Sequence, residues 1–277
     1  MMNISNFTHG AHYGSTSSPF SFDSMARVIT ICNAKGGVGK TTTAINLAAY
    51  LVAMGKYVLL ADMDPQANAT TGLGVKVGSE EPNIYHAVVS DLNPQLFLKK
   101  TSLFGFDVLP AAQSLAGATV ELVSMQEREL RLKRVLAGVR TNYDYVLIDC
   151  PPSLGLLTVN ALAASEHVLI PVQCEYFALE GLGQLLKTIE LVRQGLNPDL
   201  QVLGVLLTMY DKRNQLSQQV VNEVMKNFPG RVFDAVVPRT VSLAEAPSYG
   251  KTILQFDPGS QAARAYRRLA EEIIKTT

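Results

Sequence analysis

Cysteine is scarce in this sequence, and long apolar runs and a net charge are absent. The three cysteines, Cys32, Cys150 and Cys174, form no C-x-x-C pair, so we expect a reducing compartment, no disulfide framework and no metal or iron–sulfur ligation within one chain. No apolar run approaches the roughly 18–20 residues that span a bilayer. The 24 basic and 24 acidic side chains cancel, so any DNA contact must come from a local patch or from one assembled by dimerisation.

The bulk composition indicates a folded core preceded by a polar extension. A hydrophobic content of 47% with 17% charged residues is typical of a well-buried globular protein. Residues 1–24 have no apolar period and lack the basic and apolar regions of a signal peptide. We interpret residues 1–24 as a disordered extension, with Met25 as an alternative start, and residues 25–277 as one domain.

Strand patterns alternate with helical patterns along that domain, which predicts an α/β fold with a mostly parallel twisted sheet and helices on both faces. Ligands of such sheets bind at the carboxyl ends of the strands. Residues 66–74 are expected to form a loop that can change conformation. The expected strands are 28–31, 57–64, 106–110, 143–149, 167–172, 202–208 and 235–237. The expected helices are 44–51, 84–89, 119–139 (with Arg128, Arg131, Lys133 and Arg134 on its polar positions), 156–164, 179–194, 216–227 and 261–275, with short helical turns near Leu243.

A glycine-rich turn, AKGGVGKTT at residues 34–42, separates the first strand from the first helix. Its glycines let successive N–H groups face one anion, and the helix start adds its positive dipole end. Lys40 can reach terminal phosphates, and the Thr41 hydroxyl can ligate Mg²⁺. Ala34 stands where the general motif has glycine, and a second lysine, Lys35, follows it. Two ammonium groups on one tight loop repel each other unless an anion lies between them or one points elsewhere.

Carboxylates follow two of the predicted strands. Asp149 fits the acid that holds Mg²⁺ or its water shell. Asp64, just before a proline, is placed to orient or activate an attacking water, while Asp62 either supports the metal shell or caps the next turn. Lys35 could reach a phosphate bound by a second subunit, which would couple hydrolysis to dimerisation as a trans-acting arginine finger does.

These motifs carry a family resemblance. KGGVGKTTT (35–43), DMDPQ (62–66) and IDCPPS (148–153) resemble the nucleotide motifs of the deviant Walker A ATPases, the ParA/MinD superfamily. PVQCEY (171–176), LLTMYD (206–211) and VPR (237–239) resemble its chromosomal ParA (Soj) branch. The resemblance covers residues 26–277. It implies a single-domain P-loop NTPase fold and a Mg²⁺-dependent ATPase that converts ATP to ADP and phosphate.

The resemblance also implies roles for individual residues. Catalysis would use Lys35, which contacts the partner subunit's ATP, together with Lys40 and Asp64. The metal site would comprise Thr41, Asp64 and Asp149. The nucleotide-binding residues would be Lys35, Gly36, Gly37, Val38, Gly39, Lys40, Thr41 and Thr42 in the loop, with Met209, Pro238 and Arg239 near the adenine.

By the same resemblance, the chain would form a homodimer in the ATP state and bind double-stranded DNA without sequence preference. A ParB-type (Spo0J-like) partner would stimulate hydrolysis, and the complex would partition chromosomal or plasmid DNA in the cytoplasm, on the nucleoid and not on a membrane. Arg213 matches a DNA-holding arginine of the family, whereas Ser242 occupies another of its basic positions. Lys251 could compensate, as could Arg264, Arg267 and Arg268, although a solvated surface is the ordinary setting of such side chains.

Three alternatives remain open. A MinD-like membrane-cycling ATPase would need a basic amphipathic C-terminal helix with bulky apolar residues, whereas residues 265–277 mix acids with bases and predict a helix packed on the domain. An iron–sulfur or reductase-type relative would need a cysteine pair shared across a dimer, whereas Cys32 and Cys174 favour packing as small apolar residues. A nucleoid-based ATPase that positions a protein cargo shares every motif discussed above.

Overall fold

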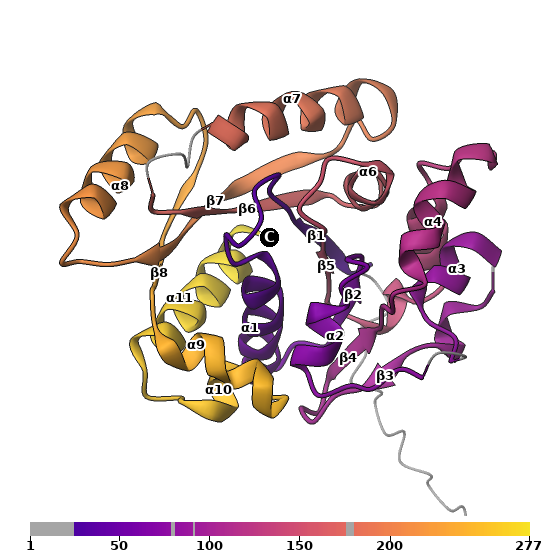
Figure 1. The fold of residues 1–277 in the computed structure, drawn as a ribbon, viewed down its shortest axis with the longest axis horizontal. Helices are drawn as coiled ribbons and strands as arrows, with labels where there is room; N and C mark the ends of the chain where they lie inside the picture. The colour runs from indigo at the N-terminus through magenta and orange to yellow at the C-terminus, as the bar shows by residue number, and fades with distance from the viewer. Residues whose placement is uncertain (1–24, 79–80, 91, 176–179) are drawn as a thin grey trace, which may run out of the picture.

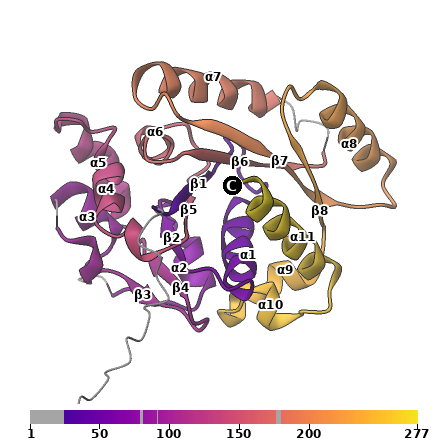
Figure 2. The same ribbon diagram turned by 180° about the vertical axis from the view of Figure 1, so that it is seen from behind.

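One eight-stranded sheet crosses the molecule, and helices cover both of its faces (Figure 1; Figure 2 shows the other side). The computed structural model describes residues 25–78, 81–90, 92–175 and 180–277, so the predicted extension 1–24 and the first residue of the predicted helix 179–194 lie outside the described residues. The strand order is β3-β4-β2-β5-β1-β6-β7-β8. Every neighbouring pair is parallel except β3 with β4.

The strands are β1 (Arg27–Ile31), β2 (Val58–Asp62), β3 (Lys99–Lys100), β4 (Phe106–Leu109), β5 (Tyr145–Asp149), β6 (His167–Gln173), β7 (Gln201–Tyr210) and β8 (Val232–Pro238). The α-helices are α1 (Lys40–Ala53), α2 (Asn68–Gly72), α3 (Ile84–Ser90), α4 (Leu115–Glu121), α5 (Arg131–Ala137), α6 (Leu156–Ala163), α7 (Glu180–Gly195), α8 (Gln215–Asn227), α9 (Val241–Glu245), α10 (Ile253–Phe256) and α11 (Gln261–Thr276). Short 3₁₀ turns include η1 (Pro94–Leu96), η2 (Leu122–Ser124), η3 (Arg140–Asn142) and η5 (Ala246–Tyr249).

The sheet is buried on both faces, as the continuous apolar strand patterns predict. Successive residues of β2 belong to different cores: Leu59 packs in the core that includes residues of α3 to α7, and Leu60 in the core that includes residues of α1 and α11. The predicted mostly parallel sheet is therefore confirmed. The short antiparallel strand β3 at its edge was not predicted.

The strand register brings the predicted site residues to one edge of the sheet. Asp149, the last residue of β5, lies in register with Ile31 of β1 on one side and with Asp62 of β2 on the other. The glycine loop after β1 and the acids after β2 and β5 therefore start from adjacent strand ends. This is the edge at which ligands of parallel sheets bind.

The predicted helix 119–139 is wrong. Helix α4 and turn η2 end by Ser124, and α5 begins only at Arg131. Glu127 between them has a left-handed backbone (φ 49°) and pairs with Arg134. Arg131 is buried and not on a polar face, because its Nε donates to the Val88 carbonyl at the end of α3 (2.8 Å). Apolar spacing alone does not reveal a left-handed residue or a buried guanidinium.

The segment 66–74, predicted as a loop, contains helix α2. Helix α2 begins after Ala67, whose left-handed backbone (φ 52°) caps it. The short helical turns predicted near Leu243 are confirmed as α9 and η5.

The C-terminal helix α11 packs on the domain, as its mixed charges predict. Its apolar face, which includes Tyr266, Leu269 and Ile273, is buried and packs against β8 and α1. Within the part of the chain that the structure describes, no helix is both long and apolar enough to cross a bilayer.

Replacing Leu269 by alanine is expected to lower the free energy of unfolding by about 3 kcal/mol, because Leu269 is fully buried and its truncation leaves a cavity. Urea denaturation would measure the change. Leu191→Ala on α7 is the matched control, since Leu191 is 69% exposed, and it should change stability by less than about 0.5 kcal/mol. Equal effects of the two substitutions would contradict the packing of α11.

Candidate nucleotide and metal site

The glycine loop between β1 and α1 presents free backbone donors. Gly39 caps α1 in a left-handed conformation (φ 89°), and among the described residues no side chain caps the start of the helix with a hydrogen bond. The helix N–H groups and the positive end of its dipole are therefore available to an anion. The loop is fixed to the sheet at Val38, whose carbonyl accepts a hydrogen bond from the Thr208 hydroxyl of β7 (2.9 Å).

The two lysines of the loop have different surroundings. Lys40 is buried, and its ammonium group donates to the backbone carbonyl of Lys35 (3.1 Å). Burial lowers the pKa of Lys40, and the charges of Asp149 and Asp64 oppose this shift. Lys35 is half-buried, and its backbone N–H donates to the Asn33 side chain (3.0 Å). Lys40 is therefore buried in the interior, whereas Lys35 remains partly exposed.

Asp149 lies at the centre of the site without a hydrogen-bond partner. Asp149 is fully buried, and neither of its carboxylate oxygens completes a hydrogen bond with a described residue. The Thr41 hydroxyl lies close enough to lower the pKa of this carboxyl group. Burial raises the pKa of Asp149 well above its ordinary value, and the charge of Asp62 raises it further, while Thr41 and Lys40 act in the opposite direction. A buried unsatisfied carboxylate next to a hydroxyl fits a divalent cation.

Protein side chains alone do not form a complete metal cage here. Among the described residues, no cluster of three or more His, Cys, Asp or Glu side chains could hold a metal ion. Mg²⁺ often uses only one or two carboxylates and takes its remaining ligands from water and substrate phosphates. Asp149 and Thr41, beside a phosphate-binding loop, match that pattern.

Asp62 and Asp64 differ in what they bind. The Asp62 carboxylate accepts hydrogen bonds from the N–H of Asp64 (3.2 Å) and from the N–H and hydroxyl of Thr70 (2.9 and 2.7 Å). Burial raises the pKa of Asp62 to about 6, against the effect of these hydrogen bonds. The structure thus shows the capping role, one of the two roles left open for Asp62. Asp64 is also buried, and its carboxylate accepts the N–H of Gln66 (2.9 Å).

A cavity of about 210 Å³ adjoins the other side of the glycine loop. Met209, Pro238 and Arg239, predicted near an adenine, all line it together with Gly39 and Thr42 of the loop. The left-handed backbone of Met209 (φ 53°) is unusual for this residue type and marks a constrained position. Leu243, Ala244 and Tyr266 also line this cavity and were not predicted as site residues. Their apolar spacing signals burial but not which cavity they line.

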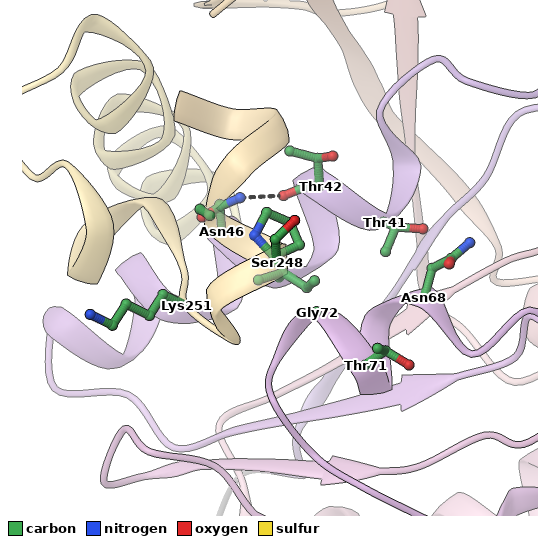
Figure 3. A pocket seen from close by; sticks show the side chains of 11 residues that line it. Thr41, Thr42, Asn46, Asn68, Thr71, Gly72, Ser248 and Lys251 are labelled. Atoms are coloured by element: carbon green, nitrogen blue, oxygen red, sulfur yellow. Dashed lines mark hydrogen bonds between the residues drawn. The ribbon is translucent and has the colours of Figure 1, made fainter. Parts of the chain in front are cut away.

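A second cavity, of about 440 Å³, lies between α1, α2 and η5 and was not predicted (Figure 3). Its lining contains no acid, and hydroxyl and amide side chains predominate among its polar groups: Thr41, Thr42, Asn46, Asn68, Thr71 and Ser248. Lys251, predicted as a DNA contact, is exposed and also lines it, at the end away from Thr41 and Asn68 in Figure 3.

The remaining basic candidates lie on the surface, and most are paired. Arg213 is 85% exposed and binds the Asp211 carboxylate through Nε and Nη2 (3.1 and 3.0 Å). The same hydrogen bonds lower the pKa of Asp211 to about 2. Ser242 donates to Asp257 (3.1 Å). Arg267 pairs with Glu271, and Arg268 with Asp234.

The three cysteines are free thiols buried in the core on one face of the sheet. This confirms the prediction that Cys32 and Cys174 pack as small apolar residues.

The comparisons with known proteins agree with this geometry. A family described as an AAA domain matches residues 26–202. The chain is 55% identical to the sporulation initiation inhibitor protein Soj of Bacillus subtilis over 90% of its own length and 98% of that protein. It is 53% identical to the chromosome partitioning protein ParA of Myxococcus xanthus, over 91% of this chain and 89% of that protein.

The chain belongs to the ParA/MinD superfamily of ATPases. A solved structure of cobyrinic acid a,c-diamide synthase from Mycobacterium smegmatis with bound ADP and magnesium has a TM-score of 0.81 and 39% identity, covering 91% of this chain and 95% of that one. The chain therefore shares its overall fold with a solved structure that holds ADP and magnesium.

Replacing Asp149 by asparagine is expected to stabilise the ligand-free protein by about 1 kcal/mol or more. Burial raises the pKa of this carboxyl group, so at neutral pH folding must either protonate it or bury its charge, and both cost free energy. The same change should weaken Mg²⁺-dependent nucleotide binding by about tenfold or more. Thermal unfolding and calorimetric titration would measure the two effects. Asp199→Asn, at an exposed position, is the control and should change neither. A less stable Asp149→Asn variant with intact Mg²⁺ dependence would contradict the assignment.

Proposed function

We propose that this chain is a partitioning ATPase that dimerises with ATP, binds double-stranded DNA without sequence preference and acts with a ParB-type partner on the nucleoid, in the cytoplasm. The observation that carries the proposal is the buried, unpartnered carboxylate of Asp149, which lies beside Lys40, Thr41 and the free N–H groups of the glycine loop. Likeness to Soj and ParA over nine-tenths of the chain supplies the biological setting.

ATP and Mg²⁺ are the ligands that this site fits. Thr41 and Asp149 would hold the metal or its waters, with Asp64 close to them. A bound Mg²⁺ neutralises charge on the transferring phosphoryl group. The N–H groups of residues 36–42 would bind the phosphates, and the cavity lined by Met209, Pro238 and Arg239 would receive the base.

The chain's own side chains then divide the work of hydrolysis. Lys40 would leave the Lys35 carbonyl, its partner in this structure, and bind a terminal phosphate. Asp64, held on its backbone side by Asp62, would orient the attacking water. Lys35, which is not committed to the interior, would reach the nucleotide of a second subunit.

The alternatives receive less support. Helix α11 buries its apolar face against β8 and α1, so that face does not serve as a membrane-binding surface of the MinD type. An iron–sulfur or reductase-type relative would need a cysteine pair shared across a dimer, whereas Cys32, Cys150 and Cys174 are buried in the core of this chain. An ATPase that positions a protein cargo instead of DNA would have the same nucleotide site. A ParB-like protein encoded next to this chain would favour the DNA cargo.

Lys35→Ala is expected to retain some nucleotide binding and to lose ATP-dependent dimerisation, because its side chain would reach the nucleotide of the second subunit. Light scattering with Mg²⁺ and ATP would measure the molecular mass. Asp64→Ala is the matched comparison, because it keeps Lys35 and should remain an ATP-bound dimer with little turnover. A Lys35→Ala variant that dimerises normally with ATP would rule out the trans role.

DNA binding is tested by retention of double-stranded DNA with ATP, with ADP and without nucleotide across a salt series. Retention is expected with ATP and to weaken steeply with salt, because phosphate contacts release counterions. Arg213→Glu should reduce retention at fixed salt by about tenfold and spare basal ATPase activity. Arg193→Glu is the control, since Arg193 is also exposed and also paired with an acid. Equal retention in all three nucleotide states would refute the proposed switch.

A further inference from the structure

Two turns from distant parts of the chain touch backbone to backbone near the cavity of Figure 3. Gly74 follows α2, and Gly250 follows η5 directly before Lys251. Both glycines are left-handed (φ 71° and 63°). A Cβ added at Gly250 would lie 2.8 Å from the Cα of Gly74, and one added at Gly74 would lie 3.3 Å from the Cα of Gly250. Because no flexible side chain separates the two turns, a displacement of one presses directly on the other.

A ladder of backbone hydrogen bonds joins Asp64 to this contact. The N–H of Ala67 donates to the carbonyl of Asp64 (2.8 Å), that of Thr71 to Ala67 (3.0 Å), and that of Gly74 to Thr71 (2.9 Å). Thr70, in the middle of the ladder, also bonds to Asp62. Residues 64–75, called here the α2 segment, therefore form one hydrogen-bonded unit that begins at the candidate hydrolytic acid.

The turn that carries Lys251 is equally well defined. The N–H of Gly250 donates to the Pro247 carbonyl (3.0 Å), and that of Lys251 donates to the Ala246 carbonyl (3.1 Å). Gly72 of α2 also approaches this turn, since a Cβ added at Gly72 would lie 3.4 Å from the Cβ of Pro247. A shift of the α2 segment would therefore move the backbone that positions Lys251.

The α2 segment also contains a strained residue. Ala67 has φ 52°, a left-handed conformation that is unfavourable for any residue with a Cβ. In this structure the α2 segment therefore holds Ala67 in a backbone conformation that alanine does not favour. If a change at Asp64 allowed Ala67 to leave its left-handed conformation, the release of backbone strain would favour a shift of the whole hydrogen-bonded unit.

We propose that the α2 segment is a relay that transmits the state of the nucleotide site to the basic turn at Lys251 through the Gly74–Gly250 contact. This inference rests on the proposed function, in which Asp64 serves hydrolysis and the chain binds DNA, and on the prediction from the sequence that Lys251 is one of the DNA contacts. The relay acts within one subunit. Its effect on DNA binding would add to that of dimerisation, which doubles the number of DNA contacts. By linkage it works in both directions, so DNA at the basic turn also alters the α2 segment.

The test compares full-length Gly74→Ala, Gly250→Ala and Gly55→Ala variants with the unsubstituted protein. Gly55 is the matched control, because it is also left-handed (φ 82°) but a Cβ there meets nothing within 4 Å. It therefore carries the backbone strain of the substitution without the steric contact. Gly74→Ala is the milder of the two test variants and covers the case in which Gly250→Ala does not fold.

The first measurement is hydrogen exchange of residues 246–251 on addition of Mg²⁺ and ATP, without DNA. In the unsubstituted protein and in Gly55→Ala, exchange of this turn is expected to change by about fivefold or more. In Gly74→Ala and Gly250→Ala it should change by less than about twofold, while the glycine loop still responds to ATP. The relay is overturned if hydrogen exchange of this turn does not change with ATP in the unsubstituted protein, or if it changes equally in all variants.

The second measurement is DNA retention with ATP relative to ADP. This ratio should fall by about fivefold or more in Gly74→Ala and Gly250→Ala but not in Gly55→Ala. Unchanged ratios overturn the relay and leave the proposed function intact. If the unsubstituted protein retains no DNA, the proposed DNA function fails, and the exchange experiment still decides whether the relay exists.

Discussion

The burial of three carboxylates close together, away from water, is the constraint on which the site depends. The parallel register of β2 and β5 brings Asp62 and Asp149 side by side, and Asp64 lies two residues beyond, all of them buried. Each carboxylate is accommodated differently: Asp62 by Thr70, Asp64 by the turn that follows it, and Asp149 by no described hydrogen-bond donor. The ligand-free protein thus holds one carboxyl group whose pKa is raised by burial, which costs free energy at neutral pH. A cation that arrives with a nucleotide relieves this cost, so binding is favoured by an instability already present in the fold.

Much of this arrangement could be predicted from the sequence. Apolar strands alternating with amphipathic helices fixed the sheet type, and acids at strand ends had to meet at one edge because parallel strands end together. The gathering of Met209, Pro238 and Arg239 beside the loop followed from family motifs, not from spacing. What could not be predicted depends on backbone dihedrals or on contacts between distant segments. The left-handed Glu127 interrupts a regular helical pattern, and the cap that Thr70 makes on Asp62 requires α2 to be in place.

Basic side chains on the surface are mostly paired with acids, in keeping with the zero net charge of the sequence. Arg213, Arg267 and Arg268 each bind a neighbouring acid, so little unopposed positive potential surrounds them. Lys251 differs, because no ion pair involves it in the described part of the chain. An overall neutral protein of this kind attracts polyanions only where a local cation is presented in a favourable geometry. Of Arg213 and Lys251, the two predicted DNA contacts, only Lys251 therefore has no acid paired with it among the described residues.

The cavity at Met209 has a consequence for how the protein is made. One wall comes from the glycine loop near the start of the folded region, and the opposite wall comes from residues 237–244 and Tyr266. The Tyr266 hydroxyl also lies 3.4 Å from that of Thr43, a contact between residues 223 positions apart. Because a ribosome delivers the chain from its N-terminus, this wall of the cavity is incomplete until α11 has emerged. The glycine loop and the strands β1, β2 and β5 are therefore synthesised well before the residues that complete this cavity, so the cavity exists only in the finished fold.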